Sequence, residues 1–133
     1  MRSLQDTRGF LVYVLPAVVY TVLIFWLGCT HINITVQQDY VPQDKLEHLG
    51  AFGVLTWLAF RALAFELIRL STGRLIVAST VISSLMGALL EAWQSLFPHR
   101  SVEFGDWVAD TLGAGLVGII LLLWIRKGRR HML

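Results

Sequence analysis

The sequence predicts an all-α membrane protein whose single domain, residues 1–133, is a bundle of four membrane-spanning helices. Of the 133 residues, 56% are hydrophobic and only 15% are charged, a composition too apolar for an ordinary soluble domain. Four stretches also carry few or no charges over the roughly 20 residues that cross a bilayer. These predicted spans are about 10–28, 47–68, 75–97 and 107–125. They use most of the chain and leave little for a soluble domain.

The first two spans are apolar runs that each contain one unusual residue. The first span has no charged residue, but Pro16 predicts a bend because proline cannot donate a main-chain hydrogen bond. The second is interrupted by Arg61, which lies near enough to the helix end for its long side chain to reach the surface, towards Glu66. At the start of this second helix, Asp44 is the expected N-cap, with Glu47 in the capping-box position three residues later.

The third and fourth spans each carry a stripe of small and polar residues. The short connection at 69–74 predicts an antiparallel hairpin of the second and third spans, and Pro98 predicts a reversal before the fourth. In the third span the stripe consists of Ser79, Ser83, Gly87, Glu91 and Ser95, with Gln94 beside it. In the fourth it consists of Asp106, Asp110, Ala114 and Gly118, with Gly113 beside it. Residues four apart share a helix face and small residues allow close approach, so both faces are expected to pack against protein and to bury Glu91.

The basic residues predict how the spans are oriented. Nine of the eleven Lys and Arg residues fall at one face of the predicted bundle, and only Lys45 and Arg100 fall at the other. By the positive-inside rule, both termini are expected to lie in the cytoplasm, as an even number of spans requires. The basic tail at 126–133 follows a span directly, so it is interpreted as an anchor on anionic lipid. We expect membrane lipids as partners and no nucleic acid.

The ionisable residues of the last three spans lie near the outer end of the predicted bundle. A charged side chain well inside a bilayer costs about 2.5–3.5 kcal/mol, and less near the interface, so carboxylates there are expected to be paired. We expect Glu91 and Asp110 to converge with the counter-charges Lys45, His48 and Arg100. The first span has no ionisable residue in this cluster and is expected to act as packing.

Three interpretations of this polar cluster are open. In the first, Arg100 bridges Glu91 and Asp106 and simply fastens the helices, because a guanidinium can serve two carboxylates. In the second, the carboxylates and the imidazole bind a metal, but no motif fixes a ligand geometry, so we expect no metal and no cofactor. In the third, a phosphate is held by Lys45, His48 and Arg100, while the carboxylates and Gln94 take sugar hydroxyls or amines. The third is favoured because the cluster lies at the depth of lipid head groups.

Several short motifs fall at the helix ends in a fixed order. They are DKLEH at 44–48, EAWQ at 91–94, PHR at 98–100, Asp106, and DTLG at 110–113. In this order they resemble the VanZ-like family of small membrane proteins, whose founding member is linked to resistance to the glycopeptide antibiotic teicoplanin. Asp110 stands where that family commonly has Asn, and Phe52 where Tyr often follows the His motif. The resemblance implies that the ligand-binding positions are Asp44, Lys45, His48, Glu91, Gln94, Arg100, Asp106 and Asp110.

Three functional hypotheses follow for a multi-pass protein of the bacterial plasma membrane. The leading one is a binding protein whose outer cluster holds a lipid-linked cell-wall precursor or a glycopeptide, and so changes antibiotic susceptibility without chemistry. The second is an enzyme acting on lipid-linked phosphate, with Glu91 or Asp106 as general base and His48 as acid, although no Ser or Cys nucleophile arrangement is recognisable. The third is a structural or accessory subunit that works with a protein partner or as a homo-oligomer. The sequence leaves the choice among them open.

Overall fold

The chain folds into four long helices, and this confirms the predicted all-α membrane bundle. The computed structural model describes residues 4–30, 43–98 and 102–130, with side chains from 7–30, 45–98 and 102–127, and these ranges contain no strand. The elements are α1 (Leu4–Gly9), a π-helical turn η1 (Phe10–Val14), α2 (Leu15–Cys29), α3 (Gln43–Glu66), α4 (Thr72–Gln94) and α5 (Phe104–Arg130). The first three are continuous, so they form one span. The four segments long and apolar enough to cross a membrane are Thr7–Cys29, Lys45–Glu66, Thr72–Gln94 and Phe104–Lys127.

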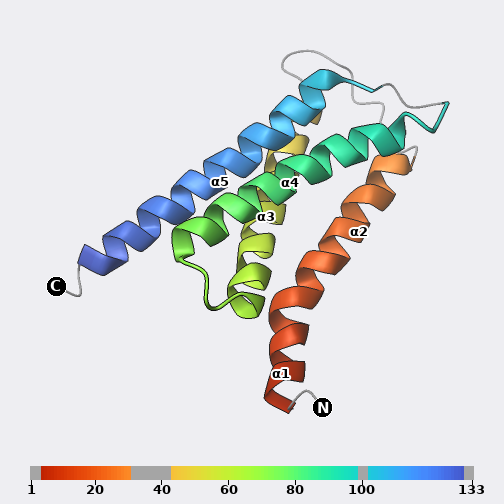
Figure 1. Cartoon of the computed structure of the whole chain (residues 1–133). Coiled ribbons are helices and arrows are strands. Elements are labelled where there is room, and N and C mark those ends of the chain that lie inside the picture. The colour runs from red at the N-terminus through yellow and green to blue at the C-terminus, as the bar shows by residue number, and fades with distance from the viewer. Residues whose placement is uncertain (1–3, 31–42, 99–101, 131–133) are drawn as a thin grey trace.

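The helices alternate in direction, so the bundle has two distinct ends (Figure 1). Helix α1 begins and helix α5 ends at one end of the bundle, where the connection from α3 to α4 also lies. At the opposite end, called the polar end from here on, α2 and α4 finish and α3 and α5 begin. Each span after the first therefore runs antiparallel to the span before it. That the polar end faces outward stays a prediction.

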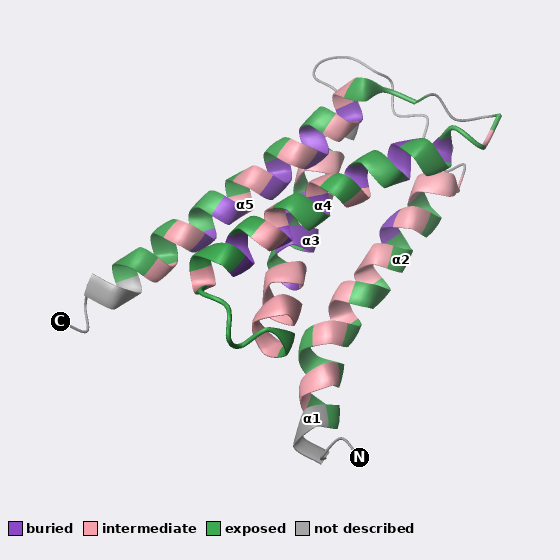
Figure 2. Ribbon diagram, in the orientation of Figure 1, coloured by how far each residue is buried: buried purple, intermediate pink, exposed green. Residues whose placement is uncertain are grey.

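Burial is concentrated where α3, α4 and α5 face one another (Figure 2). By contrast, Ile24 is the only buried residue of α2, where it packs with Phe52, Leu55 and Leu90 in a small apolar core. The outward faces of all four helices carry exposed large apolar side chains, as lipid-facing surfaces do. Helix α2 therefore contributes packing from one side, as expected from its lack of ionisable residues.

The first helix is irregular just before its proline. A π-helical turn occupies Phe10–Val14, and Pro16 follows in the first turn of α2. Pro16 has no N–H to donate to the carbonyl of Val12, four residues earlier. That carbonyl instead accepts a long hydrogen bond of 3.5 Å from Arg61 of α3. A π-helical turn thus precedes Pro16, and a neighbouring helix helps to satisfy the main chain there, while the bend expected at Pro16 stays a prediction.

Arg61 meets aromatic rings within the bundle. Its guanidinium lies 4.8 Å from the ring centroid of Trp57 and 5.2 Å from that of Tyr13, both within cation–π range. The guanidinium also donates to the Val12 carbonyl, and no ion pair joins it to Glu66 among the described side chains, so the expected reach towards Glu66 is not observed. Arg61 therefore links α3 to the first span.

The helix ends differ from the predicted spans by a few residues. Helix α4 ends at Gln94 and not at 97, because tight turns then lead into Pro98. Helix α3 begins at Gln43, so Asp44 lies in its first turn and not at the N-cap. It ends at Glu66, two residues before the predicted limit of 68, and α5 extends beyond 107–125 at both ends. Such ends depend on local capping, which hydropathy does not report.

Candidate functional site

Two helices touch backbone to backbone beneath the polar end. A Cβ added to Gly113 of α5 would overlap the main chain of Leu49 in α3, including its carbonyl oxygen. One turn further along α3, a Cβ on Gly53 would lie 3.1 Å from the Val117 side chain and 3.5 Å from the Gly113 carbonyl oxygen. Only glycine allows this approach. The contact places the start of α3 directly beside the start of α5.

The stripes predicted on α4 and α5 do face each other. On α4 the stripe residues Ser79, Ser83, Gly87, Glu91 and Gln94 are buried. On α5 Asp106, Asp110, Gly113, Ala114 and Gly118 are buried. A Cβ on Gly87 would lie only 2.6 Å from Asp110 Oδ2, so the α5 carboxylate is seated on the surface of α4. Ser95 is the exception, because α4 has ended and its exposed hydroxyl donates to the Ala92 carbonyl at 2.7 Å.

Lys45 joins the start of α3 to the start of α5. Its Nζ donates to Asp106 Oδ1 at 2.6 Å and to Glu103 Oε2 at 3.0 Å. Asp106 is buried, whereas the side chains of Lys45 and Glu103 are 33% and 55% exposed. A Cβ on Gly105 would lie 3.1 Å from Lys45 Cε, so the missing side chain leaves room for the lysine stem. The pairing compensates for burying the Asp106 carboxylate.

His48 lies one turn deeper and pairs with the second carboxylate of α5. Its Nδ1 is 2.8 Å from Asp110 Oδ1, so the imidazole hydrogen-bonds to a carboxylate whose side chain is fully buried. The His48 side chain is 17% exposed. A carboxylate on one ring nitrogen fixes the ring's orientation and directs the other nitrogen elsewhere.

Only one of the two carboxylate oxygens of Glu91, on α4, has a hydrogen-bond partner among the described residues. Its Oε2 accepts a hydrogen bond of 3.2 Å from the main-chain N–H of Glu103. Its Oε1 is buried and has no hydrogen-bond partner among the residues that the structure describes, and the same holds for the hydroxyl of Ser83. Glu91 therefore ties the end of α4 to the start of α5 through one oxygen. Helices α3, α4 and α5 thus meet around Lys45 and His48, whereas Arg100, the third predicted counter-charge, lies outside the described residues.

A cavity of about 240 Å³ lies at the polar end between α2, α3 and α4. Its polar lining residues are Glu47 and His48 of α3 and Gln94 of α4, and its other lining side chains are apolar. Gln94 Nε2 also donates to the Gly28 carbonyl of α2 at 3.0 Å, which holds the amide at the cavity wall. This cavity is where a ligand's polar group would meet the predicted site.

The structure divides the eight predicted site residues into groups. His48 and Gln94 line the cavity. Four others lie where α3, α4 and α5 meet, and each contacts a neighbouring helix or the residue just before that helix: Lys45, Glu91, Asp106 and Asp110. The Asp44 side chain and Arg100, including its predicted bridge between carboxylates, lie outside the described residues.

Two acidic residues of the site were missed from the sequence. Glu47 was assigned to helix capping, yet it lines the cavity next to His48. Glu103 was not assigned to the site, yet it holds both Lys45 and, through its N–H, Glu91. Its spacing of three residues from Asp106 was a usable signal, because one lysine can reach two carboxylates at that separation.

Fold and site together define a multi-pass membrane protein of four helices with a charged cluster at one end. In the described ranges, no group of three or more His, Cys, Asp or Glu residues is arranged to hold a metal ion. Comparisons with protein-family models, with curated proteins and with solved structures find no match for this chain. Membership of the VanZ-like family therefore stays a prediction from the motif residues.

Proposed function

We propose that this protein binds an amphiphilic ligand of the cell envelope, a lipid-linked cell-wall precursor, with a polar group of that ligand in the cavity between α2, α3 and α4. One observation carries the proposal. The cavity is lined by a carboxylate, an imidazole and an amide together with apolar side chains, and it lies at the end of the membrane spans. A concave site with few convergent polar groups is the usual form of a small-molecule site.

The volume and charge of the cavity limit which chemical group of the ligand can occupy it. A cavity of about 150 Å³ accepts benzene, or about 25 Å³ for each carbon, so 240 Å³ takes roughly ten non-hydrogen atoms. That is the size of one sugar ring, and far less than a glycopeptide. Glu47 and Gln94 favour hydroxyl or amine groups. Lys45, a predicted phosphate ligand, does not line the cavity, so a sugar fits the cavity better than a phosphate.

The predicted orientation and family agree with this ligand. If both termini lie in the cytoplasm of a bacterial cell, the polar end opens at the outer face of the plasma membrane, where cell-wall precursors are displayed. A VanZ-like protein that sequesters or shields such a precursor would change susceptibility to teicoplanin without catalysing a reaction. Those motif residues whose side chains the structure describes, such as Lys45, Glu91 and Asp106, lie at this same end of the bundle.

Binding to a lipid pyrophosphate-linked sugar tests the proposal. In protein reconstituted in nanodiscs, Glu47→Gln removes a carboxylate from the cavity wall and is expected to weaken binding about fivefold, or about 1 kcal/mol. Glu66→Gln is the matched control, because Glu66 is also exposed but lies at the opposite end of α3. If Glu47→Gln, Glu66→Gln and Gln94→Leu all bind the ligand with the affinity of the unchanged protein, this cavity is ruled out as the ligand site.

A structural or accessory role is a second candidate, favoured by one specific observation. The ion pair of Lys45 with Asp106 and the hydrogen bond of His48 to Asp110 occupy these polar groups within the protein. A cluster that only fastens helices would need no ligand. In that case Glu47→Gln changes no binding, while loss of the Lys45 pair lowers stability.

A further inference from the structure

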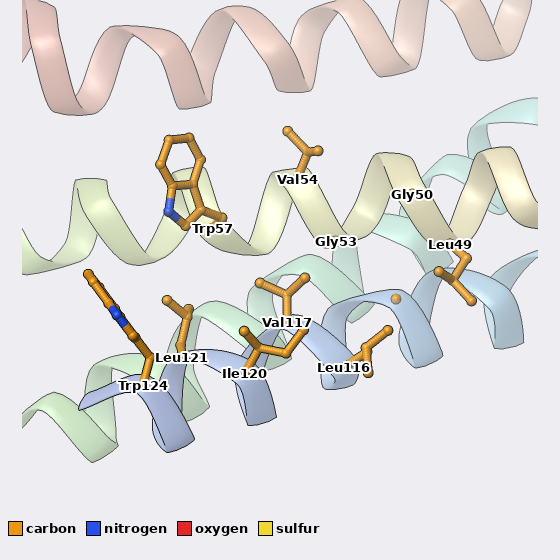
Figure 3. A pocket seen from close by; sticks show the side chains of 11 residues that line it. Leu49, Gly50, Gly53, Val54, Trp57, Leu116, Val117, Ile120, Leu121 and Trp124 are labelled. Atoms are coloured by element: carbon orange, nitrogen blue, oxygen red, sulfur yellow. The ribbon is translucent and has the colours of Figure 1, made fainter. Parts of the chain in front are cut away.

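An apolar groove of about 450 Å³ runs between α3 and α5 (Figure 3). It lies on a different face of α3 from the polar cavity, since the two share no lining residue. Glycines form much of its floor, namely Gly50, Gly53 and Gly113, and no heavy atom lies within 4 Å of a Cβ added to Gly50. Trp57 and Trp124 line its deeper part. The groove therefore exists because side chains are missing where two membrane helices meet.

We propose that this groove binds one acyl chain of a zwitterionic phospholipid from the membrane leaflet at the polar end. All eleven lining residues are apolar, and the groove lies within two membrane spans, where lipid chains are the surrounding solvent. At about 25 Å³ for each carbon, its volume takes roughly eighteen carbons, the length of one common acyl chain.

The groove's extent along the helices matches one leaflet. At about 1.5 Å per residue it covers about 12 Å of α3 from Leu49 to Trp57, and about 17 Å of α5 from Gly113 to Trp124. Half of the roughly 30 Å hydrocarbon layer is about 15 Å. A chain lying in the groove thus reaches from the polar end to about the bilayer midplane.

Charges at the mouth of the groove select the head group. Lys45 lies one turn above Leu49 on the same helix face, and its Nζ is 3.0 Å from Glu103 Oε2. Both side chains are partly exposed, so a cation and an anion are presented side by side. A zwitterionic head group places its phosphate towards Lys45 and its ammonium towards Glu103. Because a lipid chain gains no hydrophobic free energy on leaving other lipid chains, packing and these charges supply the affinity.

Native mass spectrometry of protein released from nanodiscs of phosphatidylethanolamine and phosphatidylglycerol tests this site. Wild-type protein is expected to retain one phosphatidylethanolamine per chain. Gly50→Leu and Ile120→Trp each place a side chain in the groove, from α3 and from α5, and are expected to reduce retention about tenfold. The controls Gly115→Leu and Ile119→Trp make the same changes on α5 outside the groove, where Gly115 also has open space and Ile119 is as exposed as Ile120.

Further outcomes decide between occupants. Glu103→Gln is expected to remove the preference for phosphatidylethanolamine over phosphatidylglycerol, whereas Glu66→Gln at the far end of α3 keeps it. Unchanged retention in both groove-filling variants, with native helix content and melting temperature, would overturn the proposal. So would a wild-type dimer that Gly50→Leu converts to a monomer, because the groove would then hold a second copy of the chain.

Discussion

Replacing Gly113 with alanine tests the main-chain contact between α3 and α5. The added Cβ would overlap the Leu49 carbonyl, and neither partner is a side chain that can rotate away, so the helices must separate. Overpacking typically costs about 1–3 kcal/mol, and a backbone neighbour puts this position at the upper end, about 3 kcal/mol. Alanine gains up to about 1 kcal/mol of helix propensity over glycine. Gly113→Ala is therefore expected to lose about 2 kcal/mol of unfolding free energy.

Gly115→Ala supplies the matched control two residues further along the same helix. Its Cβ would have no heavy atom within 4 Å, so it gains the same propensity without the overlap and should be neutral or slightly stabilised. Because propensity cancels between the two variants, their difference of about 3 kcal/mol measures the contact alone. Unfolding in mixed SDS micelles, followed by circular dichroism, reports both values. If the unfolding free energies of the two variants agree within about 0.5 kcal/mol, the backbone contact is refuted.

Two further predictions concern the charged junction. Lys45→Met removes this partner from the buried Asp106 carboxylate and should lower the free energy of unfolding, although less than the loss of a fully buried pair would, because Lys45 is one-third exposed. Lys45→Met with Asp106→Leu should recover most of that loss in the same unfolding assay, and no recovery would contradict the pairing. Glu91→Gln keeps an acceptor for the Glu103 N–H and removes a buried charge, so its melting temperature should stay the same or rise. Glu91→Leu removes the acceptor and should lower the free energy of unfolding by about 1 kcal/mol. A Gln variant less stable than the Leu variant would be inconsistent with this account of Glu91.

The helices and their contact faces could be read from the sequence because both depend on local spacing. Glu91 and Asp110 are buried as predicted, since each continues an i, i+4 stripe of small residues. Ser95 was placed on that stripe wrongly, because the periodicity continues past the last helical residue, Gln94. The partners of Lys45 were harder to predict. Several carboxylates fall at the same end of the bundle, and the sequence carries no information on which is nearest.

Composition and residue spacing were enough to predict four apolar spans, the small-residue faces of the last two, and a charged cluster at one end. These follow from composition and from the fixed 3.6-residue period, which need no knowledge of neighbouring helices. The packing of the helices was needed to establish that Lys45 pairs with Asp106 and Glu103, that His48 pairs with Asp110, and that Glu47 lines a cavity. Those pairings depend on the rotation and height of α3 against α5. That geometry is set by close packing between residues more than 60 positions apart, as where Gly113 meets Leu49.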